Sequence, residues 1–161
     1  VAEELMGIPD FDQPDYSELF AEEKEMVAKL KKVFLMVAGS AVQKYGPDLD
    51  AHQQLLMAAA DILIEIYMAE STILRTEKMA KSQGRENVKE QIAMAQLYLY
   101  EAVDIINSKG KEGIASIAEG DEQRMMLMGL RRFTKYNTLP NVVGLRELIA
   151  SKLVSENEYC F

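Results

Sequence analysis

The spacing of the apolar residues is the feature that most constrains this fold. In the first third of the chain they recur every three or four positions, which matches one face of an α-helix. No window alternates with period two for long enough to predict a strand. The sequence therefore predicts an all-α protein that begins with a long helix ending at Tyr45. Its apolar face holds Met26, Val27, Leu30, Val33, Phe34, Val37, Ala38, Ala41, Val42 and Tyr45.

Glycine and proline divide the rest of the apolar pattern into further helices. Gly46 and Pro47 end the first helix, because proline cannot continue a helix and glycine tolerates a left-handed turn. A second long helix is predicted to begin at Asp48 or Asp50 and to run to about residue 82, with Gly84 after it. Its apolar stripe is Leu55, Leu56, Ala59, Ile62, Leu63, Ile66, Ile73 and Leu74.

A third long helix is predicted over residues 85–108, with Gly110 as its stop signal. A short helix around residues 114–118 then ends at Gly120. The face of the third helix that points to the core is predicted to hold Val88, Ile92, Ala95, Leu99, Val103 and Ile106.

Two more short helices complete the predicted fold. Asp121 is the expected N-cap of a helix over residues 121–134, and Asn141 is the expected N-cap of a last helix after the loop 136–140. With short turns throughout, the prediction is an up-and-down helical bundle of three long helices plus about three shorter ones.

The domain organisation follows from the first residues. Pro9 and Pro14 lie among three aspartates, so residues 1–16 are predicted to be a linker or docking arm. Ser17 is the expected N-cap of the first helix, and residues 17–161 are the predicted bundle domain. The chain starts Val-Ala-Glu-Glu rather than with methionine, which suits a fragment cut from a longer protein.

The charge of the chain argues against nucleic acid as a partner. Net charge is −8, and residues 1–30 alone hold nine acids against Lys24 and Lys29. A phosphate-binding surface needs clustered lysine and arginine instead. Cys160 is the only cysteine, so no intrachain disulfide is expected and a reducing compartment such as the cytoplasm is indicated.

No catalytic, cofactor-binding or metal-binding set is predicted from the residues. His52 is the only histidine and lies in the expected first turn of a helix beside Asp50, which is a usual surface position. The Glu-x-x-His pairs of a di-iron bundle are missing, because Leu49 stands three residues before His52. Acidic pairs such as Asp61 with Glu65 are expected to form a solvated or ion-paired helix face.

The interaction candidates lie in the last third of the chain. Methionines at three nearby positions spread over almost half of a helix circumference, so one is expected to face a second surface while core packing uses others. Five basic residues accompany them. Three kinds of partner are considered for these basic side chains: the chain's own acids, an acidic partner domain or anionic lipid. The set is Arg124, Met125, Met126, Met128, Arg131, Arg132, Lys135 and Arg146.

Several segments in order resemble the C-terminal end of long acyl-CoA dehydrogenases, and most closely the very-long-chain, membrane-associated type with its bacterial relatives. They are the runs Glu119-Gly-Asp-Glu-Gln-Arg-Met and Gly129-Leu-Arg-Arg-Phe-Thr-Lys-Tyr136, then Asn141-Val-Val-Gly-Leu-Arg-Glu-Leu-Ile-Ala150 and the final Glu158-Tyr159. The run Tyr67-Met-Ala-Glu-Ser-Thr-Ile-Leu-Arg-Thr-Glu-Lys78 is similar to the second long helix of the same appendage. The resemblance spans residues 15–161.

This resemblance implies a non-catalytic domain. The FAD site, the acyl-CoA pocket and the catalytic glutamate of that family lie in a preceding core, so no cofactor is expected in this chain and FAD is expected in the parent. The resemblance implies packing on that core, homo-oligomer formation and, in the membrane-associated members, contact with the inner membrane face. The acidic composition here argues against membrane contact. The alternative function is a stand-alone helical interaction module with a methionine-lined groove.

Overall fold

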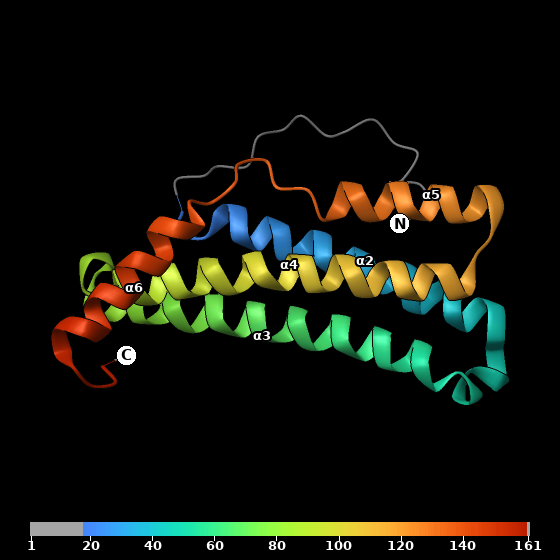
Figure 1. Ribbon diagram of the computed structural model, residues 1–161, viewed down its shortest axis with the longest axis horizontal. Coiled ribbons are helices and arrows are strands. Elements are labelled where there is room, and N and C mark those ends of the chain that lie inside the picture. Colours follow the sequence, from blue (N-terminus) through green and yellow to red (C-terminus); the bar gives the residue numbers. More distant parts are fainter. Residues whose placement is uncertain (1–17, 161) are drawn as a thin grey trace.

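A computed structural model describes residues 18–160 of the chain. Every regular element in that range is helical, which confirms the predicted all-α class (Figure 1). The predicted linker or docking arm, residues 1–16, and Ser17 lie outside the described residues. The first helix begins at Ala21 with Phe20 in the N-cap position, which is later than the predicted cap at Ser17. The helices are α2 (Ala21–Tyr45), α3 (Gln53–Gln83), α4 (Lys89–Ile117), α5 (Gly120–Phe133) and α6 (Val142–Glu156), with 3-10 helices at Gly46–Ala51 and Arg85–Val88.

The first four helices run up and down. Gln96 on α4 donates a hydrogen bond to Glu23 on α2 (2.7 Å), and at the other end Lys44 on α2 donates to the carbonyl of Ile117 (2.6 Å). These two contacts make α2 and α4 parallel, so α3 is antiparallel to both. Figure 1 shows α3 and α5 on opposite sides of the layer formed by α2 and α4.

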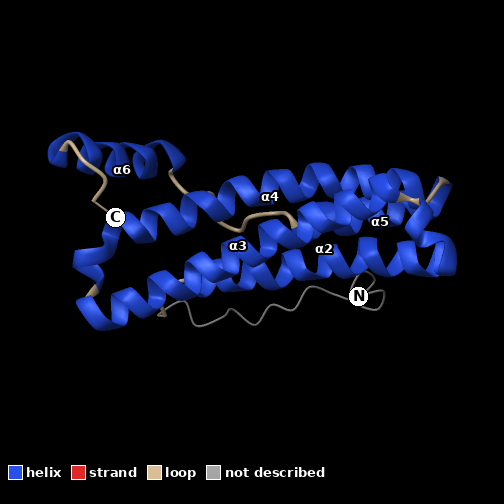
Figure 2. Ribbon diagram, turned by 90° about the horizontal axis from the view of Figure 1, so that it is seen from below, coloured by secondary structure: helices blue, strands red, loops and turns tan. Residues whose placement is uncertain are grey.

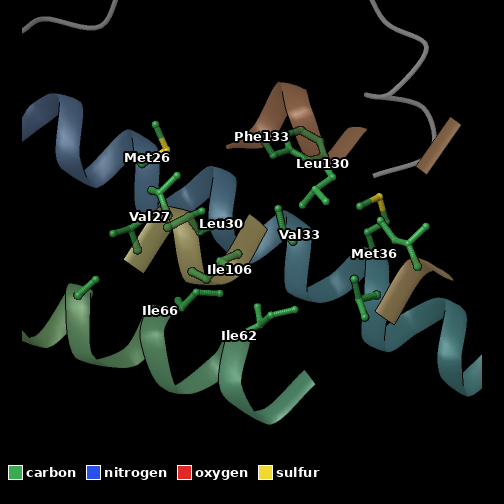
Figure 3. Close-up of a cluster of buried hydrophobic side chains, with 14 of the residues drawn as sticks. Met26, Val27, Leu30, Val33, Met36, Ile62, Ile66, Ile106, Leu130 and Phe133 are labelled. Carbon is green, nitrogen blue, oxygen red and sulfur yellow. The ribbon is translucent and has the colours of Figure 1, made fainter. Parts of the chain in front are cut away.

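The core lies between these four helices. Leu30 and Val33 from α2 meet Ile62 from α3, Ile106 from α4 and Leu130 from α5, and all five side chains are fully or almost fully buried (Figure 3). Burying a large aliphatic side chain contributes about 1.5–3 kcal/mol. Helix α6 is different because none of its residues is buried, and it packs against α4 at one end of the bundle (Figure 2).

Two predicted helix ends are confirmed by the backbone. Gly46 (φ 49°) follows α2 and Gly84 (φ 87°) follows α3, and both φ angles lie in the region that favours glycine. Asn141 is also the N-cap of α6, since its side-chain oxygen accepts a hydrogen bond from the Gly144 amide (3.1 Å). These turn signals therefore act locally, as the sequence predicts.

The predicted break at Gly110 is wrong. Helix α4 continues through Gly110 and Gly113 to Ile117, so the separate short helix around residues 114–118 does not exist. A Cβ atom on Gly110 would lie 2.7 Å from Leu130, and one on Gly113 would lie 2.7 Å from Val37. These glycines allow close packing of α4 against α5 and α2 rather than ending a helix.

Helix starts differ from the prediction by a few residues. Residues 48–51 form a 3-10 helix, and α3 begins at Gln53 with His52 at its N-cap. Helix α5 begins at Gly120, so Asp121 lies in its first turn and Glu119 holds the cap position. Asp121 still suits this end, because a carboxylate in the first turn interacts favourably with the helix dipole.

Candidate interaction surfaces

The predicted methionine cluster on α5 is divided between two environments. Met126 is buried in the core, while Met125 and Met128 are 47% and 69% exposed. Helix α5 also buries Leu130 and Phe133, so it is amphipathic and covers the α2–α4 layer with one face. Two of the three methionines therefore reach the surface and one does not.

The structure does not bring the five predicted basic residues into one cluster. Arg124 pairs with Asp121 one turn earlier (2.9 Å), and Arg146 on α6 pairs with Glu101 on α4 (2.9 Å). Arg131 instead lines the same groove as Lys111 of α4. Lys111 is ten residues from Glu101, the partner of Arg146, or about 15 Å along the helix. Arg124 and Arg146 thus form ion pairs with the chain's own acids, which is one of the predicted alternatives.

Arg131 lines a groove between α4 and α5. The groove has a volume of about 300 Å³, and its lining combines the two cations Lys111 and Arg131 with aliphatic side chains. Among the residues that the structure describes, neither of these two cations has an ion-pair partner. The lining contains no methionine, unlike the predicted methionine-lined groove: it is Lys111, Ala115, Gln123, Leu127, Leu130 and Arg131.

A second surface, on α3, was not predicted. Six large apolar side chains on the side of α3 that faces away from the core are between 44% and 67% exposed. The other side of α3 is buried throughout its length, so this helix is apolar on both faces. A helix that is apolar all round is typically buried on all sides. The six residues, called here the α3 outer face, are Met57, Leu63, Ile64, Tyr67, Met68 and Leu74.

The carboxylates near the α3 outer face are all partnered by flanking helices. Asp61 pairs with Lys109 of α4 (3.5 Å) and Glu70 with Lys31 of α2 (2.6 Å). Glu65 accepts a hydrogen bond from the Tyr98 hydroxyl (2.8 Å). No other charged residue occurs between positions 57 and 74, so each carboxylate near this face has a partner on α2 or α4 over about five helical turns.

The apolar stripe predicted for α3 includes residues of this surface, but the prediction places them on the buried side. Leu63 and Leu74 were expected on the buried side, and they are 48% and 53% exposed. At 100° per residue both lie roughly a quarter of a turn away from the line through Ile62, Ile66 and Ile73. A helix with more apolar residues than one face can hold is expected to have a second apolar face that becomes buried.

The ionisable groups with displaced pKa values are structural. Burial, then the hydrogen bond to Glu65, raises the pKa of Tyr98 to about 12. The hydrogen bond from Lys24 lowers the pKa of Glu77, against a smaller opposing effect of burial. Burial, together with the nearby carboxylates of Glu23 and Asp104, raises the pKa of Tyr136.

His52 and the acidic residues do not form a recognisable reactive site. The His52 ring lies against Tyr45 with 3.7 Å between ring centroids, which is a packing contact at the α2–α3 turn. Within residues 18–160, no group of three or more histidine, cysteine or acidic side chains is arranged to hold a metal ion. None of the helices in this range is long and apolar enough to cross a membrane.

The family model for the acyl-CoA dehydrogenase C-terminal domain matches residues 29–132. This stretch covers α2 from its third turn, all of α3 and α4, and almost all of α5. The chain therefore belongs to the acyl-CoA dehydrogenase C-terminal domain family.

Two relatives are similar over nearly the whole chain. A probable acyl-CoA dehydrogenase of Bacillus subtilis is 36% identical over 157 residues, which is 98% of this chain and 26% of that protein. The crystal structure of an acyl-CoA dehydrogenase complexed with FAD from Bacillus anthracis matches with a TM-score of 0.88 and 38% identity, over 99% of this chain and 26% of that chain. The chain thus spans about a quarter of the length of these relatives.

Proposed function

We propose that this chain serves as a non-catalytic C-terminal domain of an FAD-dependent acyl-CoA dehydrogenase. The parent enzyme would remove two hydrogens across the α,β bond of an acyl-CoA, and FAD would be bound by its catalytic core. The family match supports this assignment, as does the FAD complex of the Bacillus anthracis relative. The domain itself would supply packing and oligomerisation.

The observation that carries the proposal is the α3 outer face. Monomeric proteins rarely expose apolar patches of more than a few hundred Å², and larger ones mark interaction sites. A permanent interface resembles a domain core cut in half, with few charges at its centre. The α3 outer face has this character, because its nearby acids are all paired sideways with α2 and α4.

The occupant we propose for this face is the catalytic core of the same enzyme. In each relative, the rest of the chain is about three times as long as the part that this domain matches. A surface tethered to its partner on one polypeptide experiences an effective concentration in the millimolar range. The covalently attached core would therefore compete well against a second copy of the domain.

A binding experiment with a matched pair of variants tests the proposal. The catalytic region of the same enzyme is produced separately, and its affinity for the 161-residue chain is measured by isothermal titration calorimetry. Ile64→Asp on the α3 outer face is expected to weaken binding by roughly 10- to 100-fold, the size of an interface hot spot. Met128→Asp on α5 is the control, because it adds the same charge at a helical position that is at least as exposed (69%, against 55% for Ile64).

Two results would count against this assignment. Equal affinities of the two variants would place the contact elsewhere. The second result concerns a dimer of this chain, which light scattering of the chain alone detects. A dimer that Ile64→Asp dissociates would mean that the α3 outer face binds a second copy of the domain.

A further inference from the structure

We propose that the acidic N-terminal segment, residues 1–17, docks in the groove between α4 and α5, with its carboxylates beside Lys111 and Arg131. The observations behind this assignment are the lining of the groove, the division of charge along the chain, and the distance that the segment must cover. It does not depend on the function proposed above, since both partners belong to this chain.

The lining of the groove combines apolar side chains with two cations. Leu127 and Leu130 of α5 and Ala115 of α4 line it, together with Lys111 and Arg131. Leu130 is held in place because its methyl groups pack directly over Gly110. The ligand that fits such a site combines apolar side chains with carboxylates a few residues away.

The charges of the chain are segregated in a way that matches this groove. Residues 123–146 hold five basic residues and no acid, although the whole chain has a net charge of −8. Two of the five, Arg124 and Arg146, are paired with Asp121 and Glu101. Arg131 of that segment lines the groove together with Lys111, and neither has an ion-pair partner among the described residues.

Residues 1–17 have the complementary composition. They contain five carboxylates and no lysine or arginine. Glu3 and Glu4 directly precede Leu5 and Met6, and Ile8 follows two residues later. In the sequence, carboxylates thus adjoin apolar residues, which complements a groove lined by leucines and two cations.

The segment is long enough to reach the groove. Helices α2 and α4 are parallel and in register from Glu23 with Gln96 to Lys44 with Ile117, so Lys111 lies at the level of residue 38 of α2. From residue 20 to that level is about 27 Å along the helix axis. An extended chain spans this distance with about eight residues, so any of residues 1–10 has sufficient length to reach it.

An intrachain occupant also has an advantage over separate molecules. A segment tethered within about 30 Å of its site has an effective concentration in the millimolar range, which exceeds that of a free acidic peptide. Charge pairs in such a groove are weak singly, at about 0–1 kcal/mol. Tethering allows several weak contacts to hold the segment in place.

Thiol cross-linking tests the location directly. In a Cys160→Ser background, cysteine is introduced at Ile8 and at Ala115, and disulfide formation with oxidised glutathione is followed by mass spectrometry. The control pair is Ile8→Cys with Met57→Cys. The Asp61–Lys109 pair places Met57 of antiparallel α3 at about the level of residue 113, so the control is at the same level but on the opposite side of the bundle.

The Ile8–Ala115 disulfide is expected to form about tenfold faster than the control at low salt, as a monomer and independently of protein concentration. Lys111→Glu with Arg131→Glu is expected to reduce the rate to that of the control, and so is Glu3→Lys with Glu4→Lys. Combining all four reversals is expected to restore the fast rate, which a folding defect would not do.

Three outcomes would overturn the proposal. One is an equal rate for both cysteine pairs, and another is a failure of the combined reversals to restore the fast reaction. The third concerns lipid: vesicles of phosphatidylcholine with phosphatidylserine that abolish the cross-link, where pure phosphatidylcholine vesicles do not, would assign the groove to an anionic membrane surface.

Discussion

Helices α3 and α5 show how differently two apolar helices can use their surfaces. Helix α5 concentrates methionine and arginine in a short stretch, yet its apolar residues mostly form one face that covers the core. Helix α3 has no conspicuous cluster, but its apolar residues occupy both the inner face and the outer face. The distribution of apolar residues around a helix therefore reveals a second apolar face better than their density along the sequence does.

The two faces of α3 are expected to respond very differently to truncation. Ile62→Ala removes a fully buried side chain and should lower the free energy of unfolding by about 2–5 kcal/mol. Ile64→Ala on the outer face should change it by no more than about 0.5 kcal/mol in the chain alone. Urea denaturation measures both, and a loss above about 2 kcal/mol for Ile64→Ala would show that the outer face is already covered within this chain.

The contact of α5 with α4 can be weakened from the α4 side. Gly110→Ala would place a Cβ atom against Leu130, and such overpacking should cost about 1–3 kcal/mol of stability. Gly39→Ala on α2 is the matched control, because nothing lies within 4 Å of its Cβ position and alanine favours the helix. The thermal midpoint should fall for the first variant and rise slightly for the second; a rise for both would contradict the close contact.

The pH dependence of folding stability should reflect the contact between α3 and α4 at Tyr98. The pKa of Tyr98 is raised to about 12 in the folded chain, so its neutral form is favoured there. Between pH 10 and 12 the unfolded state loses this proton first, and stability should fall as pH rises.

The Tyr98→Phe variant isolates this contribution. It should make the decline between pH 10 and 12 shallower by about 1 kcal/mol, with the remainder coming from groups such as Tyr136, whose pKa is also raised. Unfolding by urea at several pH values measures the slope. An unchanged slope in the variant would exclude the Tyr98–Glu65 contact as its source.

The smallest effect is expected at α6. Arg146→Ala removes an exposed ion pair with Glu101 and should change global stability by less than about 1 kcal/mol. Because α6 buries no residue and packs on α4, hydrogen exchange in α6 should accelerate while exchange in α3 stays unchanged. Acceleration in both helices would mean that α6 unfolds together with the bundle.

The parts of the fold that could be predicted from the sequence are those decided by local chemistry. Gly46 and Gly84 require positive φ angles, and Asn141 caps the helix that follows it, so the sequence indicates these ends correctly. Gly110 carries the same signal but lies inside α4, because its neighbour Leu130, distant in the sequence, fills the space of a side chain. Such tertiary contacts are invisible to a local pattern.

The candidate surface was predicted less well than the fold, for a related reason. Periodicity identifies apolar positions on α3, but a single sequence does not say which of two apolar faces meets the rest of the bundle. Leu63 was therefore assigned to the core although it is exposed, and Met126 was a surface candidate although it is buried. The role of the α5 residues as an interaction surface stays a prediction.

Native methionines permit the most direct test of the central claim, that the α3 outer face covers the catalytic core. Met57 and Met68 belong to that face, while Met125 and Met128 are exposed on α5. Oxidation by hydrogen peroxide follows exposure, and peptide mass spectrometry measures the rate at each methionine. Addition of the separately produced catalytic region should slow oxidation of Met57 and Met68 roughly fivefold or more and leave Met125 and Met128 unchanged. Protection of the α5 methionines alone would contradict the account.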